Sequence, residues 1–385
     1  MTDSSISSDF GIYIHWPFCT SLCPYCDFNS HVERSVDFGA WRRAFASELE
    51  RYAAETGDRT VRSIFFGGGT PSTMPPDLAA AAIDNVLNLW MPAKGIEITL
   101  EANPGTSDIE KFRSFRDVGI NRLSVGVQSL RDEELSRLGR MHSAAEARSA
   151  FDAARSVFDR ASMDLIYARQ FQSVEDWRAE LSEALEMHPN HLSLYQLSIE
   201  PGTVFGKLYR ANRLPGLPDE NLEADLYLAT QELCDSKGLQ AYEVSNHSAK
   251  GFESVHNLTY WRSGDYVGIG PGAHGRLTLN GRRIATDTEK SPGDWLTSVI
   301  RNGSGEKSRT AVGARDRAIE YLMMSLRLSE GVNLLRLNSL DSELIDFARI
   351  EELENEGLVE TDGESLIATL RGRLLLNCVL TNLIE

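Results

Sequence analysis

Long apolar runs are absent from this chain of 385 residues. No stretch approaches the roughly 18 consecutive apolar residues of a membrane-spanning helix. The first ten residues, MTDSSISSDF, also lack the basic and apolar regions of a signal peptide. We therefore expect a cytoplasmic protein with a flexible N-terminus over residues 1–10.

Basic residues are in the minority. Lysine and arginine together number 39 against 56 aspartates and glutamates, which gives a formal net charge of -17. A chain of this charge repels polyanions, so we expect no nucleic acid among its partners. The acidic run at 341–364 extends the same argument to the C-terminal tail.

Cysteine is scarce as well, with five residues in the chain, and their positions favour a metal site over a disulfide framework. Cys19, Cys23 and Cys26 lie within eight positions of one another, which in a cytosolic chain favours a metal site. The remaining two, Cys234 and Cys378, stand in apolar helical surroundings, and we expect both to be buried thiols.

Hydrophobic periodicity predicts an α/β fold. Short β-branched or aromatic runs alternate with stretches of helical period about six times, which is typical of a parallel sheet with crossover helices. The pattern fits a partial (βα)6 barrel or an open doubly wound sheet, and both place ligands at the carboxyl ends of the strands. The predicted strands cover 11–16, 62–66, 96–101, 122–127, 163–167 and 191–198, and the predicted helices cover 38–54, 77–89, 107–118, 144–158 and 174–187.

The regular alternation of predicted strands and helices ends after Pro201–Gly202. A core domain over 11–215 is followed by an accessory region over 216–310, in which 240–275 is predicted to be irregular loop with short strands. The tail over 311–385 shows helices and then a hairpin with a turn at Asp362–Gly363, which is the pattern of a small winged-helix-like domain.

The cysteine cluster directly follows the first predicted strand. Three thiolates at spacings of four and three suit zinc or an iron–sulfur cluster. Zinc would need a fourth ligand, which His15 or His31 could supply. A four-iron cluster held by three cysteines would leave one iron open to bind a substrate or cofactor.

CxxxCxxC after the first strand of a βα repeat, within IYIHWPFCTSLCPYCDF, resembles the radical S-adenosylmethionine family that contains the oxygen-independent coproporphyrinogen oxidases. The resemblance runs from Tyr13 to the tail. It implies that Cys19, Cys23 and Cys26 hold a [4Fe-4S] cluster whose open iron binds S-adenosylmethionine. It further implies the residues that position this cofactor, which are Tyr13, Tyr25, Gly68, Gly69, Thr70, Glu101, Gln128, Arg140 and Asp164.

Two features separate branches of that family. The oxidases proper resemble CxxxCxxCxC, whereas this chain has Phe28 at the position of the extra cysteine. His256, Tyr260 and Trp261 form an HNxxYW pattern, which resembles the haem-binding motif of a haem-chaperone branch. Imidazole is a good axial ligand for haem iron, and the two aromatic residues could stack on the macrocycle or position a propionate. Tyr260 or another histidine such as His247 is the alternative iron ligand.

The resemblance therefore implies a protein that binds haem and delivers it to haem-dependent clients, for which we expect the inner membrane surface as the location. An electron donor is expected as a further partner, and the assembly is expected to be a monomer or a dimer. The enzymatic alternative is the decarboxylation of coproporphyrinogen III by an adenosyl radical. A structural zinc protein is the third class.

Two segments depart from the family's text. Where the family resembles DLIYGLPGQT, this chain reads Asp164-Leu-Ile-Tyr-Ala168-Arg169-Gln170-Phe171-Gln172-Ser173, so we expect the loop after the fifth strand to follow another path. The segment Gly270–Gly275 contains Pro271 and His274, and we expect His274 to be a core histidine.

Overall fold

The computed structural model describes residues 10–106 and 108–384. The predicted flexible segment 1–10 lies outside the described residues except for Phe10, which begins the first strand.

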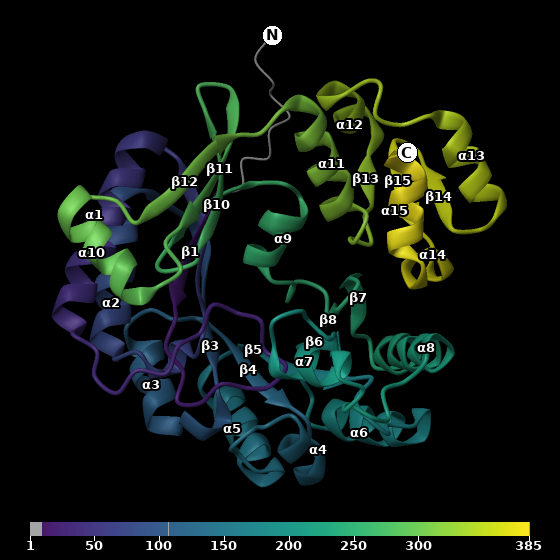
Figure 1. Ribbon diagram of the computed structural model, residues 1–385, viewed down its shortest axis with the longest axis horizontal. Helices are drawn as coiled ribbons and strands as arrows, with labels where there is room; N and C mark the ends of the chain where they lie inside the picture. The colour runs from purple at the N-terminus through teal and green to yellow at the C-terminus, as the bar shows by residue number, and fades with distance from the viewer. Residues whose placement is uncertain (1–9, 107, 385) are drawn as a thin grey trace.

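Six strand–helix units make up the first half of the chain, as the periodicity predicted (Figure 1). The strands are β1 (Phe10–Trp16), β2 (Thr60–Gly68), β3 (Met91–Ala102), β4 (Arg122–Gln128), β5 (Arg160–Tyr167) and β6 (His191–Gln196). The helices are α1 (Phe38–Thr56), α2 (Pro76–Leu89), α3 (Ile109–Asp117), α4 (Asp132–Arg137), α5 (Ala144–Val157), α6 (Val174–Glu186), α7 (Val204–Arg210) and α8 (Glu220–Ser236). The short helix α4 was not predicted.

The six strands pair in parallel and in chain order, with the helices covering the outer face of the sheet (Figure 1). Tyr13 of β1 and Tyr195 of β6 nevertheless line the same cavity, so the sheet curves until its two sides face each other. This is the predicted partial barrel. Parallel pairing brings all six carboxyl ends to one rim, which is where the residues implied by the family resemblance stand.

Local sequence sets where the outer helices begin. Ser143 accepts from the backbone N–H of Glu146 and Glu146 bonds back, which forms a capping box before α5. Ser173 and Asp176 form the same box before α6. These caps fix the lengths of the loops that follow β4 and β5 at the rim.

The accessory region enlarges this sheet to twelve strands instead of forming an irregular loop, so the prediction for 240–275 is wrong in part. One edge gains a β8–β7 hairpin beside β6, and the other gains four strands beside β1, with β9 parallel to it. The added elements are β7 (Gln240–Glu243), β8 (Asn246–Ser248), α9 (Val255–Trp261), β9 (Asp265–Ile269), β10 (His274–Leu279), β11 (Arg282–Thr288), α10 (Pro292–Asn302) and β12 (Glu306–Ala311).

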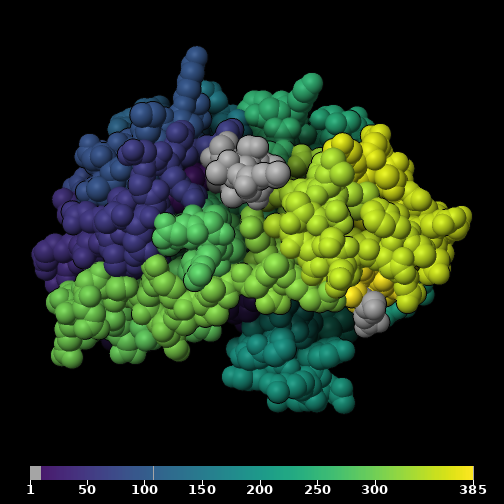
Figure 2. Space-filling view, turned by 90° about the horizontal axis from the view of Figure 1, so that it is seen from above, coloured from purple at the N-terminus to yellow at the C-terminus, as the bar shows by residue number. Residues whose placement is uncertain are grey.

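The C-terminal segment has its own small core and a three-stranded sheet, as the hairpin pattern predicted. Figure 2 shows it, in yellow, as a lobe of the surface beside the sheet domain. Its elements are α11 (Ala314–Ser325), β13 (Val332–Asn333), α12 (Leu334–Leu340), α13 (Phe347–Asn355), β14 (Val359–Asp362), β15 (Ser365–Ala368), α14 (Leu370–Leu374) and α15 (Leu376–Ile384). None of the described helices is long and apolar enough to cross a membrane.

Two side-chain environments differ from expectation. Cys234 is buried as predicted, whereas Cys378 on α15 is exposed. His274, expected in the core, has 62% of its side chain exposed, and its Nδ1 contacts the Asp287 carboxyl group on the neighbouring strand β11. The start of β10 lies at the surface, so an imidazole there needs no buried partner.

Candidate functional site

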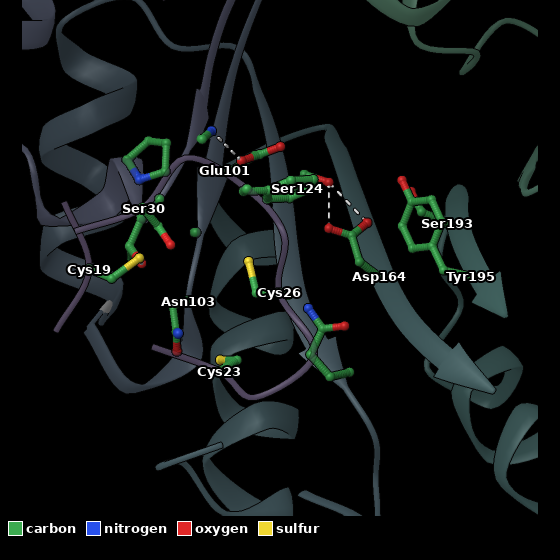
Figure 3. Close-up of a pocket in the computed structure, with 18 of the residues that line it drawn as sticks. Cys19, Cys23, Cys26, Ser30, Glu101, Asn103, Ser124, Asp164, Ser193 and Tyr195 are labelled. Carbon is green, nitrogen blue, oxygen red and sulfur yellow. Dashed lines mark hydrogen bonds between the residues drawn. The ribbon is translucent and has the colours of Figure 1, made fainter. Parts of the chain in front are cut away.

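The three clustered cysteines face one large cavity. The loop after β1 carries them, and a turn in which the Cys26 N–H donates to the Cys23 carbonyl (3.2 Å) folds that loop. All three are unpaired and only partly buried, and they line a cavity of about 640 Å³ at the rim of the barrel (Figure 3). The cavity places them opposite the strand ends that bear the predicted polar residues.

Polar groups on other elements already contact the sulfurs. The Thr70 hydroxyl donates to Cys19 Sγ (3.3 Å), and Arg140 Nη1 lies 3.4 Å from Cys23 Sγ. Burial raises the pKa of the Cys19 thiol, against the hydrogen bond from Thr70, and raises that of Cys26 to about 11. A cation or cluster is therefore needed to hold these sulfurs as thiolates.

The donor set fits an iron–sulfur cluster. Among the described residues, no three histidine, cysteine or acidic side chains come together around a single metal ion. A four-iron cluster needs a wider arrangement, because each thiolate binds a different iron. Three soft sulfur donors around an open cavity match that requirement.

The glycines after β2 are required by close packing. A Cβ on Gly68, whose φ is +111°, would lie 2.6 Å from the His15 ring, and one on Gly69 would lie 2.8 Å from the Pro17 backbone. The Gly69 N–H donates to the Trp16 carbonyl, which ties the glycine turn to the end of β1. Only glycine fits here, and Thr70 is thereby placed beside the cluster loop.

Two carboxyl groups, from β3 and from β5 on the other side of β4, point into the cavity (Figure 3). Glu101 on β3 accepts from the Gly68 N–H at 3.2 Å, and Asp164 on β5 accepts from the Ser124 hydroxyl at 2.8 Å. Burial, together with the negative charge of Asp164, raises the pKa of Glu101 to about 8. Burial also raises the pKa of Asp164, although hydrogen bonds from serines oppose it. The pair favours a ligand that brings hydrogen-bond donors or positive charge.

Gln128, Arg140 and Tyr25 complete the rim, and all three line the cavity. Gln128 has a φ of +66°, at a break in the register between β4 and β5, which turns its side chain towards the cavity. Arg140 donates to the Gly126 carbonyl at 3.2 Å. The structure thus gathers all nine residues predicted to position the cofactor around one space.

The HNxxYW residues divide between two environments. His256 and Tyr260 on α9 line the inner end of the same cavity, where the His256 ring stacks on Phe65 with centroids 4.9 Å apart. Both ring nitrogens are occupied, Nδ1 by the Ser63 hydroxyl (2.8 Å) and Nε2 by the Tyr260 hydroxyl. Burial lowers the pKa of His256 to about 3, so the imidazole is neutral.

Trp261 is not among the residues that line the cavity. The Arg327 guanidinium lies 4.7 Å from the centroid of its ring, and the Ser325 hydroxyl donates to its carbonyl. One face of α9, with His256 and Tyr260, therefore lines the barrel, while Trp261 contacts the C-terminal segment.

Sequence reasoning missed further polar residues that point into the barrel from β4 and β6. Arg122, His191, Ser193 and Tyr195 line the cavity from β4 and β6. Their signal was a polar side chain at every second position of a buried strand, with Arg122 and Ser124 on β4 as the example.

The loop after β5 holds two non-glycine residues in the left-handed region of the backbone. Ala168 and Phe171 stand where the family's text has glycine, and both adopt positive φ, +56° and +60°. Ion pairs from Arg169 to Glu180 and Glu134 hold this conformation in place of glycine's freedom.

Comparisons with known proteins were consistent with this architecture. Residues 13–183 match the radical SAM superfamily, and residues 313–375 match the HemN C-terminal domain. The structure of coproporphyrinogen III oxidase (HemN) from Escherichia coli aligns with 98% of this chain and 90% of its own, with a TM-score of 0.81 and 21% identity, which shows the shared fold.

Whole-chain relatives narrow the family. Haem chaperone HemW of Escherichia coli is 36% identical, with 96% of each chain covered, and that of Haemophilus influenzae is 37% identical, with 95% of each covered. The mitochondrial radical S-adenosyl methionine domain-containing protein 1 of Mus musculus is 36% identical over 99% of this chain and 88% of its own. The predicted resemblance is confirmed: this chain belongs to the HemW family of the radical SAM superfamily.

Proposed function

We propose that this protein is a haem carrier that binds a [4Fe-4S] cluster, S-adenosylmethionine and haem, and delivers the haem to haem-dependent proteins. The observation that carries the proposal is the single cavity, which has the three cysteines at its mouth and His256 and Tyr260 at its inner end. The names of the HemW relatives support the haem-chaperone role.

Cys19, Cys23 and Cys26 would hold the cluster. When bound, the cluster and S-adenosylmethionine supply one-electron chemistry. Thr70 and Arg140 would donate to the cysteine sulfurs, as they already do, and so stabilise thiolates. Glu101 and Asp164 would accept hydrogen bonds from the cofactor, with Tyr13, Tyr25, Gly68, Gly69 and Gln128 completing its surroundings.

His256 is the proposed haem ligand, and the structure sets a condition for this role. Its imidazole is neutral, which is the form that binds iron. The Tyr260 hydroxyl occupies Nε2, so ligation requires Tyr260 to move aside. Trp261 would act indirectly, by fixing the end of α9 against the C-terminal segment.

We further propose a cytoplasmic location, clients at the inner membrane surface, and an electron donor as partner. The assembly is proposed to be a monomer that dimerises when the cluster and cofactor are bound. Gel filtration of the protein with and without reconstituted cluster tests the last point, with a change in elution volume as the expected result.

The test of the carrier function is an anaerobic haem titration of cluster-reconstituted protein, followed by the Soret band. We expect saturable binding of about one haem per chain. His256→Ala should abolish that binding and leave the visible absorption of the cluster unchanged. A parent protein that binds no haem but converts coproporphyrinogen III when given reductant and S-adenosylmethionine would replace the carrier proposal with the oxidase alternative.

A further inference from the structure

The cavity extends inward beyond the residues predicted to hold the cofactor. Alternate residues of a strand share a face, so Ser124 and Arg122 on β4 point the same way, one layer apart. In the register, Glu101 pairs with Ser124 and Thr99 pairs with Arg122. Arg122 therefore lies one layer deeper than the Ser124–Asp164 contact, and it lines the cavity there.

Arg122 is a buried cation with hydrogen-bonding capacity to spare. The side chain is 3% exposed, and Nη1 donates to the Phe252 carbonyl at 3.0 Å. A guanidinium carries five N–H donors, and within residues 10–106 and 108–384 this is the one hydrogen bond that it makes. A buried guanidinium with free donors at a cavity wall is a site for a planar anion.

The nearest carboxylate does not saturate Arg122. Glu97 lies 3.8 Å from Nη1, which is beyond hydrogen-bond distance. That carboxylate also accepts from the backbone N–H of His256 at 3.1 Å and from Arg160 at 3.4 Å. Glu97 thus anchors the first turn of α9 and offsets the charge of Arg122 without using its donors.

The rest of the inner end suits a flat ligand with an acidic substituent. The Tyr13 and Phe65 rings, which the register places at the level of Thr99 and Arg122, supply apolar walls, and Asn257 on α9 supplies a further hydrogen-bonding group. The outer layer carries the carboxyl groups of Glu101 and Asp164, and its arginine, Arg140, already contacts Cys23 Sγ and the Gly126 carbonyl. Arg122 is therefore the better complement for a carboxylate of the ligand.

We propose that Arg122 binds a carboxylate of a tetrapyrrole, a haem propionate, at the inner end of the barrel. This rests on the proposed carrier function. It places the acidic edge of the ligand next to α9, whose His256 and Tyr260 line the same end of the cavity.

The experiment compares protoporphyrin IX with its dimethyl ester, which keeps the ring but has no carboxylate. Binding of both to the full-length protein is followed by porphyrin fluorescence, and binding of haem by the Soret band. The parent should bind the free acid about 10- to 100-fold more tightly than the ester, as expected for a hydrogen-bonded charge pair. Arg122→Met should bind both equally, because the carboxylate has lost its partner.

Two further variants keep the result interpretable. Arg122→Lys retains the buried charge and should keep part of the preference for the free acid over the ester. It therefore replaces Arg122→Met as the test variant if Arg122→Met fails to fold. Arg283→Met is the matched control: Arg283 is equally buried, pairs with Asp265 and does not line the cavity. It should keep the full preference for the free acid.

The outcomes separate the two proposals. The assignment of Arg122 is overturned if Arg122→Met retains the preference for the free acid over the ester, or if the parent shows no such preference. In either case the carrier function stands if haem still binds. Preference for the free acid that depends on Arg122, without binding of haem, supports Arg122 and removes the carrier function. A parent that binds neither porphyrin nor haem overturns both. Loss of S-adenosylmethionine affinity in Arg122→Met would assign Arg122 to the carboxylate of that cofactor instead.

Discussion

Replacing Arg169 with leucine tests whether its buried ion pair with Glu180 stabilises the loop after β5. Arg169 and Glu180 have side chains 3% and 1% exposed, and the two are hydrogen-bonded. Glu180 also accepts from the Ser129 hydroxyl (2.6 Å) and the Leu130 N–H (2.7 Å), directly after Gln128. The pair therefore ties the loop after β5 to the strained turn at Gln128.

Removing one partner of a buried pair costs about 3–5 kcal/mol, because the other charge stays buried. Ser129 and Leu130 would still donate to Glu180 in Arg169→Leu, so we expect the lower end, a loss of about 3 kcal/mol in the free energy of unfolding. Urea denaturation of the cluster-free protein, followed by circular dichroism, measures this loss.

Arg178→Leu is the matched control, because Arg178 lies on α6, the helix that carries Glu180. Arg178 pairs with Glu232 at the surface, with side chains 39% and 67% exposed, so its loss should cost at most about 1 kcal/mol. The double variant Arg169→Leu/Glu180→Gln should recover much of the lost stability, because no unpaired buried charge remains. If Arg169→Leu is no less stable than Arg178→Leu, the argument that this pair holds the loop is refuted.

Three further predictions concern the site. The pKa of Glu101 is raised to about 8 in the fold, so its protonated form contributes stability that is full below about pH 4 and is lost as pH rises through about 8. Glu101→Gln should therefore weaken the pH dependence of the melting temperature of the cluster-free protein between these values. A variant with the same pH dependence as the parent would contradict this. Gly69→Ala should lower stability by about 2 kcal/mol or more in a urea titration, while Gly293→Ala, where the nearest atom to the new methyl lies 4.0 Å away, should change it little. In native cluster-reconstituted protein, alkylation mapped by peptide mass spectrometry should reach Cys378 and spare Cys234, whose pKa burial raises to about 12; a labelled Cys234 would show that its helix opens.

The sequence by itself determined the six-fold βα repeat, because hydrophobic periodicity reports which side of each element is buried. It also determined which residues meet at the rim. Parallel strands place their carboxyl ends at one edge, so Glu101 and Gln128 had to come together with the cysteine loop once the repeat was recognised. The CxxxCxxC and HNxxYW patterns were local and needed no tertiary information.

Only the tertiary structure decided how the accessory region is used. The pairing of β9 with β1 and of β8 with β6 depends on sheet edges formed far away in the chain. The same applies to His256, whose neighbours Ser63 and Phe65 come from β2. The HNxxYW motif alone does not predict whether the ring nitrogens of His256 are hydrogen-bonded to other residues.

The loop after β5 gives the physical reason most directly. From sequence, loss of glycine at 168 and 171 predicted another path, since local preference disfavours positive φ for alanine and phenylalanine. In the structure both residues have positive φ, and Arg169 pairs with Glu180 on α6 and Glu134 on α4. Contacts between segments distant in sequence can outweigh local backbone preference, and only the folded chain shows where they do.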